Sequence, residues 1–434
     1  MAAQPESVQE ALEAAARAAA AGGGTWRTPP LPAVREPAAF GSDPPGQLAE
    51  AILRDALGRG AEAIHIETER DGLALRLHVD GIVHEKPNFK SHLPGDLGKR
   101  LIERFESVAA LPARAPRKAV FRARLDGQVV WLRVALCPTP YGHRLVVRPI
   151  AAPMEIAALG LSADAVQAFR EVLAVPSGLV LVAGPPKSGR TTTLRALVAE
   201  IGPGRPTLAI DPGREFVADG IRRLHIGSEA GLPVPWGIKA CLEQPPGVLV
   251  VDEIRDAPAV VAAIEAALAG HLVLAAVPSD DLWPDATMLL APGVDPLALA
   301  AALVAISVQR LVRKVCPECK GPADASALAA LGIQPGRAAR LCHPSPPRGE
   351  GGVRGPGKGC PKCRRAGYAG RTGLFCGLRV NEAVMPVMRQ DLPGDNICWA
   401  ARPLGPKSLE EAGRAMVLEG TTTPEEVLRV MERR

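Results

Sequence analysis

The sequence has few aromatic residues, with only seven Phe, five Trp and two Tyr among 434 positions. Hydrophobic residues nevertheless make up 47% of the chain. Packed cores are therefore expected, built mainly from Ala, Leu and Val rather than from large rings. A chain of this length is expected to form about two to four domains.

The sequence also lacks a long apolar run. The two most apolar windows, 260–277 and 296–312, are interrupted by charged or polar residues, and neither provides the roughly 20 apolar residues of a membrane span. The start of the chain shows neither the basic nor the apolar region of an export signal. We therefore expect a cytoplasmic protein whose nine cysteines are metal ligands or reduced thiols rather than disulfides.

Neither sign of charge dominates. The chain has 51 basic and 46 acidic residues and a net charge of +5, which is too balanced to indicate nucleic-acid binding by itself. One local basic group, Lys358, Lys362, Arg364 and Arg365, keeps that hypothesis open. Because no set of stacking aromatic residues accompanies the group, we expect no nucleic-acid partner.

Residues 184–193 contain the frame of a phosphate-binding loop. The pattern GxxxxGK[ST] is met at Gly184, Gly189 and Thr191, but Arg190 stands where the lysine belongs. An apolar run before the loop predicts a buried parallel strand, and helical spacing after it predicts a helix. This arrangement directs backbone N–H groups and a helix N-terminus toward a phosphate. The predicted nucleotide-binding residues are Gly184, Pro185, Pro186, Lys187, Ser188, Gly189, Arg190, Thr191 and Thr192.

A second apolar strand pattern, 247–251, ends in the carboxylates Asp252 and Glu253. A phosphate-loop enzyme needs such a pair opposite its loop, because one acid holds Mg²⁺ and the other polarises the attacking water. Acidic turn residues are the alternative interpretation. We predict Mg²⁺ at Thr191 and Asp252, and catalytic roles for Glu253, Asp252 and Arg190.

Four of the nine cysteines form two CxxC pairs. Two such pairs supply the four thiolates that a structural zinc ion prefers. The spacing between the pairs is long, and a loop rich in Pro and Gly accounts for it. Unliganded thiols are the alternative. The predicted zinc ligands are Cys316, Cys319, Cys360 and Cys363.

The patterns divide the chain into five parts. Strand and helix patterns alternate in the second and third, with period-two strands in the second and buried parallel strands in the third. The predicted parts are a flexible tether at 1–44, a small α+β domain at 45–150, an α/β phosphate-loop core at 151–312, a cysteine-bearing insert at 313–375 with a disordered loop at 334–358, and a helical subdomain at 376–434.

From about residue 50 to the C-terminus, the chain resembles the secretion ATPase family, which comprises type II secretion ATPases and their type IV pilus assembly relatives. The resemblance follows many ordered blocks rather than one motif. The matching stretches are 64–67, 76–81, 138–142, 184–193, 252–256, 269–274, 309–313 and 359–373.

The resemblance implies a fold and an assembly. Family members have an N-terminal domain hinged to a RecA-like ATPase domain, with a four-cysteine zinc insert, and they form hexameric rings. They use ATP-driven domain motion to build fibres from an inner-membrane platform protein, so a peripheral association with that membrane is implied. Whether the ring is homomeric or mixed stays open. Arg133 and Arg148 lie where the family directs arginines toward the nucleotide.

The departures from the family pattern cluster in the motifs expected to bind and hydrolyse the nucleotide. Lys187 replaces a loop glycine and Arg190 replaces the loop lysine. The acidic box keeps Asp211 and Glu215, but its first glutamate has become Ile210, and the family's later histidine has become Pro278.

These departures predict that nucleotide binding survives and that hydrolysis is slow. The arginine fork does not fit the narrow channel of a lysine ammonium, and Lys187 restricts a loop that often needs positive φ. Lys187 can also return an ammonium to the phosphates from another direction. We expect ATP, Mg²⁺ and structural Zn²⁺ as cofactors. An active motor subunit and a catalytically impaired scaffold subunit of the same machinery both remain open.

Overall fold

The structure is a computed structural model. It describes residues 37–70, 72–79, 82–85, 97–109, 111, 117–150, 154–211, 221–224, 233–279, 293–323, 325–333, 354–355, 359–363, 365–380, 402–403, 406 and 408–431. Most of the predicted tether lies outside these residues. So does the predicted disordered loop 334–358, apart from Arg354–Gly355.

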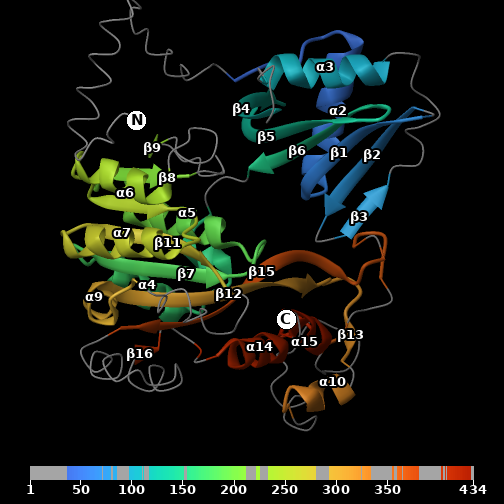
Figure 1. Cartoon of the computed structure of the whole chain (residues 1–434). Coiled ribbons are helices and arrows are strands. Elements are labelled where there is room, and N and C mark those ends of the chain that lie inside the picture. Colours follow the sequence, from blue (N-terminus) through green and yellow to red (C-terminus); the bar gives the residue numbers. More distant parts are fainter. Residues whose placement is uncertain are drawn as a thin grey trace, which may run out of the picture.

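The first part of the described chain forms an antiparallel sheet with strand order β3-β2-β1-β6-β5-β4. Two helices, α2 and α3, lie against it (Figure 1). Alternate strand residues are buried, as expected for a sheet with one covered face. The elements are α2 (Pro44–Gly58), β1 (Ala61–Glu69), β2 (Gly72–Val79), β3 (Ile82–Glu85), α3 (Leu97–Ala109), β4 (Arg117–Leu125), β5 (Gln128–Thr139) and β6 (Gly142–Ile150).

The core of this sheet begins upstream of helix α2. Phe40 is completely buried and its ring lies 5.0 Å from that of Phe105, edge to face. Ala38 forms a bridge to Ala123 of strand β4. The chain therefore joins the domain core at Phe40, a few residues before α2 begins.

The second sheet has eight strands in the order β16-β15-β12-β7-β11-β10-β8-β9. The strands from β12 to β9 are parallel, and β15 and β16 continue the sheet antiparallel. Its elements are η2 (Ile156–Leu159), α4 (Ala163–Leu173), β7 (Gly178–Gly184), α5 (Arg190–Ile201), β8 (Thr207–Ile210), β9 (Arg222–Leu224), α6 (Val234–Leu242), β10 (Val248–Val251), α7 (Ala257–Leu268), β11 (Leu272–Pro278), α9 (Pro296–Ala302), β12 (Leu303–Val315), β15 (Tyr368–Arg379) and β16 (Arg402–Pro403).

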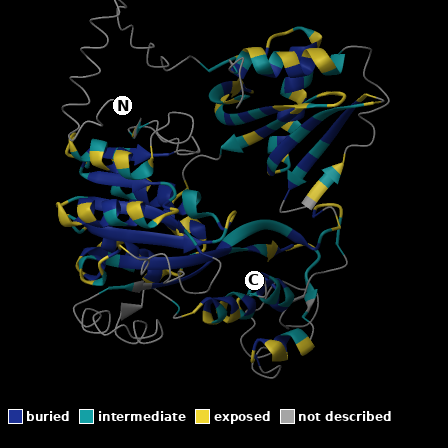
Figure 2. Cartoon of the chain, viewed as in Figure 1, coloured by how far each residue is buried: buried dark blue, intermediate teal, exposed yellow. Residues whose placement is uncertain are grey.

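Helices cover both faces of the parallel part. Helices α6, α7 and α9 pack on the face that carries Leu179 and Leu181, whereas η2, α4 and α5 pack on the face that carries Val180 and Val182. Strands β7 and β10 are buried throughout (Figure 2), which explains their unbroken apolar sequences. The predicted fold class, an α/β core with a small α+β domain, is confirmed.

The remaining elements lie beside β12 and β15 (Figure 1). Helix α15 is fixed to β12 by Glu426, which accepts hydrogen bonds from the backbone and side chain of Arg313. Among the described residues, no helix has the length and apolar character needed to cross a membrane. These remaining elements are β13 (Gly321–Pro322), α10 (Ala325–Ala330), β14 (Arg354–Gly355), α14 (Leu409–Leu418) and α15 (Pro424–Met431).

Candidate nucleotide site and metal centre

The predicted loop connects the carboxyl end of β7 to the first turn of α5. Only glycine fits at its start, because a Cβ on Gly184 would lie 2.4 Å from Ser188 Oγ and 2.6 Å from the Gln309 carbonyl oxygen. Gly189 caps α5 with a φ of 94°, and Lys187 also adopts a left-handed φ, 67°. Successive amides in mixed left- and right-handed conformations form concave anion sites, so the loop backbone suits a phosphate.

Gln309 of strand β12 holds this loop through a hydrogen bond. Its side chain is 1% exposed, and Nε2 donates a hydrogen bond of 2.8 Å to the Ser188 carbonyl. Gln309 was not among the site residues predicted from the sequence. A signal was present, because Gln309 follows the mostly apolar run 303–308, and a buried glutamine needs a hydrogen-bond partner.

The arginine that replaces the loop lysine points to the acidic strand end. Arg190 Nη2 lies 2.8 Å from Glu253 Oε1, and the two side chains are 11% and 21% exposed. Arg255 Nε donates to the other carboxylate oxygen of Glu253 at 2.7 Å. Glu253 is therefore held between two guanidinium groups, and only 21% of its side chain is exposed.

Asp252 and Asp211 follow two adjacent parallel strands. Strands β10 and β8 pair up to Val251 and Ile210, and the Asp252 amide donates to the Ile210 carbonyl. Burial above all, and then the charge of Asp211, raise the pKa of Asp252 to about 7, although a hydrogen bond with Thr191 opposes the shift. A carboxylate beside a second acid and a loop hydroxyl suits a divalent cation, whose charge would stabilise the ionised form.

Two more arginines act on this acid pair. Arg195, on helix α5, is 7% exposed. Burial lowers its pKa, and the charges of Asp252 and Asp211 counteract this. Burial and the neighbouring Arg148 lower the pKa of Arg133, and the same two acids oppose the shift. Arg133 and Arg148 are cross-strand partners on β5 and β6, so the first sheet brings positive charge toward the acids. Arg195 was not predicted, although an arginine among apolar residues of α5 was a signal.

The predicted loop residues differ in accessibility. Gly184 and Ser188 are buried, whereas Pro186 and Lys187 are exposed. The half-buried members are Pro185, Gly189, Arg190, Thr191 and Thr192.

Several buried polar atoms of the site have no hydrogen-bond partner among the described residues, namely Ser188 Oγ, Arg190 Nη1 and Asp252 Oδ1. Such atoms are uncommon in folded proteins, and each needs an explanation such as a bound water, a bound ion or a side-chain movement when a ligand enters. The residues present therefore fit a nucleotide phosphate and a divalent cation. The predicted site residue Glu215 lies outside the described residues. Ile210 is completely buried, so the position of the lost acid serves the core.

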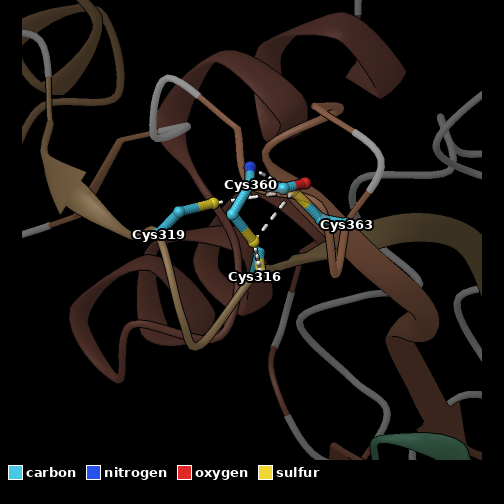
Figure 3. Close-up of side chains that lie close together, drawn as sticks. All are labelled: Cys316, Cys319, Cys360 and Cys363. Atoms are coloured by element: carbon cyan, nitrogen blue, oxygen red, sulfur yellow. Dashed lines mark hydrogen bonds between the residues drawn. The ribbon is translucent and has the colours of Figure 1, made fainter.

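The four predicted cysteines come together at one point, from two segments far apart in the sequence (Figure 3). Their sulfur atoms all lie within 4.8 Å of one another. The separations include 3.9 Å for Cys316 and Cys360, 3.6 Å for Cys319 and Cys363, and 3.7 Å for Cys360 and Cys363. Tetrahedral Zn–S bonds of about 2.3 Å place sulfurs about 3.8 Å apart, so the cluster fits a zinc ion.

The electrostatics of the cluster also suit a metal. Backbone amides of Cys360 and Gly367 donate to the Cys363 sulfur at 3.2 and 3.3 Å. These amides, that of Cys360 above all, lower the pKa of Cys363 to about 6. Burial and its sulfur neighbours raise the pKa of Cys319 to about 12. Four thiols that cannot all ionise at neutral pH without a cation match a structural site, in which the metal takes the place of the protons.

The chain is similar to known proteins over most of its length. The family described as type II/IV secretion system protein matches residues 39–429. The type II secretion system protein E of Pseudomonas aeruginosa is 32% identical over 393 residues, covering 88% of this chain and 75% of the relative. The type IV pilus assembly ATPase PilB of Thermus thermophilus is also 32% identical over 393 residues, which cover 88% of this chain and 42% of that relative.

Solved structures share the fold at lower identity. The ATPase DotB of Yersinia pseudotuberculosis aligns with a TM-score of 0.61 and 17% identity over 92% of this chain and 96% of that chain. The pilus retraction motor PilT with bound ADP gives a TM-score of 0.57 and 18% identity, over 88% and 96% of the two chains. The family match and the relatives above 30% identity each span most of the sequence, and the chain therefore belongs to the type II/IV secretion system protein family.

Proposed function

We propose that the chain is an ATP-binding motor subunit of a type II secretion or type IV pilus assembly machine, with slow intrinsic hydrolysis. The observation that carries the proposal is the meeting of the loop and the acidic strand end, where Arg190 contacts Glu253 at 2.8 Å. Its relatives are named as a type II secretion protein and a pilus assembly ATPase.

The described side chains have distinct roles in this proposal. The loop amides bind the phosphates. The Thr191 hydroxyl and the Asp252 carboxylate would hold Mg²⁺, which would neutralise charge that develops on the phosphates. Glu253 orients the attacking water. Because Arg133, Arg190, Arg195 and Lys187 outnumber the nearby acids, the site favours an anion before any ligand enters.

The catalytically impaired alternative rests on the same contact. A glutamate that is paired with Arg190 and Arg255 accepts hydrogen bonds from guanidinium groups rather than from water. The family pattern also places a lysine at Arg190, and arginine does not replace a lysine in a narrow phosphate channel. We propose that both effects reduce the rate of hydrolysis without preventing binding.

The assembly is proposed by likeness to the family. A hexameric ring would place Arg133 and Arg148 of each first domain near nucleotide sites, and the platform protein of the inner membrane would receive the domain motion. The chain would then act from the cytoplasm. In the single chain, an ion pair of 3.0 Å joins Arg371 of β15 to Glu62 of β1, which supports a direct mechanical link between the two sheets.

The test is Mg²⁺-dependent ATP turnover by the wild type, Glu253→Gln and Arg190→Lys. We expect slow turnover in the wild type, none above background in Glu253→Gln, and a gain of about tenfold or more in Arg190→Lys, because an ammonium then reaches the phosphates and releases Glu253. Turnover by Glu253→Gln equal to the wild type would reject the assignment of the catalytic carboxylate.

The zinc proposal has a separate test. We expect about one zinc ion per purified chain, and loss of this metal from a Cys360→Ser, Cys363→Ser variant. Elemental analysis measures the stoichiometry without reference to activity. Cys137 is exposed and Cys376 belongs to the core beside α14, so Cys137→Ser is the matched control and should keep the metal. Equal zinc content in all three proteins would contradict a tetracysteine site.

A further inference from the structure

The phosphate loop contains two cations, Lys187 and Arg190, and their surroundings differ. We propose that Lys187 is the side chain that contacts the phosphates of a bound nucleotide, and that Arg190 instead holds the carboxylate of Glu253. The proposal rests on the proposed function, because it takes the loop to bind a nucleotide. It assigns the missing lysine's role to a position three residues earlier in the chain.

Arg190 is already committed. Its Nη2 contacts Glu253 at 2.8 Å, and only 11% of the side chain is exposed. Its Nη1 is buried as well, so a ligand that enters the loop cannot reach this nitrogen unless Arg190 moves. If Arg190 turned toward a phosphate, the Glu253 carboxylate would lose this partner and would face the same phosphate, which repels it. Arg190 is therefore expected to stay paired with Glu253 when a nucleotide binds.

Lys187 is not committed. The side chain is exposed, and no ion pair joins it to any residue in the described ranges. Its ammonium is a compact charge on a flexible stem with three donors, which contacts phosphate without a fixed approach direction. An exposed lysine at the tip of an anion-binding loop can therefore reach phosphates that the backbone amides hold.

The backbone at Lys187 supports a functional role. Its φ of 67° is a left-handed conformation that side chains with a Cβ rarely adopt, and a glycine would adopt it without strain. Residues that keep such a conformation cluster at ligand sites. The following residue is fixed on both sides, since the Ser188 amide donates to the Pro185 carbonyl at 3.1 Å and Gln309 holds the Ser188 carbonyl. The loop thus presents Lys187 from a rigid base.

The decisive experiment measures binding of a fluorescent ATP analogue with Mg²⁺ by the full chain, together with the thermal midpoint. Lys187→Gly should weaken binding about tenfold or more, because a charged hydrogen bond to phosphate is lost. The same change should raise the midpoint by about 2–4 °C, because the left-handed strain disappears. Lys187→Gln removes the charge but keeps the strain, so it should weaken binding without raising the midpoint.

A double variant of the loop tests the same proposal a second way. Lys187→Gly combined with Arg190→Lys moves the ammonium to the ordinary position, and binding should return to within about threefold of the wild type. If Lys187→Gly and Lys187→Gln bind as tightly as the wild type, the inference is overturned while the proposed function stands. If the wild type itself does not bind the analogue, both fail.

A double-mutant cycle tests the role of Arg190. If Arg190 acts through Glu253, Arg190→Gln should weaken nucleotide binding in the wild-type background, because the released carboxylate repels phosphate. In a Glu253→Gln background, the same change should alter the affinity by less than about threefold. A direct phosphate contact by Arg190 would weaken binding about tenfold in both backgrounds, and that result would overturn the assignment.

Discussion

Glu426 and Glu253 are each held between two arginines, and the two clusters differ in completeness. Glu426 of helix α15 is fully buried and accepts five hydrogen bonds, all from Arg313 and Arg429. Glu253, beside the phosphate loop, is partly exposed and contacts Arg190 and Arg255. The charges are alike, but in the Glu253 cluster Arg190 Nη1 has no hydrogen-bond partner among the described residues.

This difference in hydrogen bonding indicates that the two charge clusters have different roles, one in stability and one in ligand binding. A fully satisfied buried network fixes one geometry, and the Arg313 guanidinium also stacks on Tyr368, 4.1 Å from the ring centre. This joins α15 to the strand that leads into the cysteine cluster. An incomplete network gains stability when a ligand supplies the missing partners. The Glu426 cluster therefore stabilises the fold, whereas we propose that the Glu253 cluster is completed by an anion and a cation that bind together.

The largest expected effect is at the complete cluster. Glu426→Gln leaves two half-buried arginines, 22% and 38% exposed, without their counter-charge and should destabilise α15 by about 2–3 kcal/mol. Hydrogen exchange of the α15 amides should then accelerate about a hundredfold, since each 1.4 kcal/mol is a factor of ten. Glu253→Gln is the matched control and should change exchange of its neighbours by less than tenfold. Equal effects at both sites would remove the distinction.

The same variant has a defined pH dependence. Burial alone would raise the pKa of Glu426, but the hydrogen bonds from Arg429 and Arg313 lower it below its ordinary value of 4.5. A lowered folded-state pKa contributes stability that is complete above the unfolded value and is lost as the pH falls through the folded value. The gap between wild type and Glu426→Gln should therefore be full at pH 7 and should shrink as the pH falls below about 4.5. A gap that does not change with pH would contradict the ionised pair.

A smaller effect of opposite sign is expected at the incomplete cluster. Burial, and then the charge of Asp211, raise the pKa of Asp252 to about 7. A raised folded-state pKa destabilises the ionised form, so Asp252→Asn should increase the free energy of unfolding by about 1–3 kcal/mol at pH 8 without ligands. The gain should grow between about pH 4 and pH 7 and stay constant above. Thermal midpoints across this range measure it.

Magnesium and nucleotide provide the control for this variant. At pH 8 they should raise the midpoint of the wild type and have little effect on Asp252→Asn, because the neutral amide does not supply the ligand charge. Wild type that is more stable than the variant at pH 8 without ligands would contradict a buried acid whose ionised form the fold destabilises.

Gln309 should give an effect of about 1 kcal/mol. Gln309→Met keeps the volume and removes the hydrogen bond to the Ser188 carbonyl. We expect a modest loss of stability and faster exchange of the loop amides at 188–191, with the exchange of α15 unchanged as the internal control. If only the global stability changes, Gln309 fills the core and does not hold the loop.

Most of the fold could be predicted from the sequence, because its signals lie in short continuous stretches. The apolar strands β7 and β10 and the two CxxC pairs are continuous patterns, and parallel strand ends meet at one edge of a sheet. Thus Gly184–Thr191 and Asp252 could be expected near one another, and the family match confirms the resemblance. The assignment of these residues to nucleotide chemistry stays a prediction.

The contacts that distinguish the two clusters could not be predicted. Arg313 and Glu426 are 113 positions apart, and Arg190 and Glu253 are 63 apart. Nothing in their spacing says which arginine meets which acid, because the choice depends on the packing of whole elements. The left-handed backbone at Lys187 and the burial of Arg195 likewise follow from the loop and helix geometry. The sequence showed which charges are present, and only the fold shows how they are paired.

The smallest expected effect concerns Arg255, the more exposed partner of Glu253. Its side chain is 75% exposed, and ion pairs of this kind contribute about 0–1 kcal/mol because water and salt screen them. Arg255→Ala should therefore change the thermal midpoint by less than about 2 °C, whereas Arg313→Ala should lower it several-fold more. Turnover is the second measurement: Arg255→Ala frees one carboxylate oxygen of Glu253 for water and should leave the rate equal or higher. A rate that falls about tenfold would mean that Arg255 orients Glu253 for catalysis, and the exposed arginine would then belong to the working site rather than to its rim.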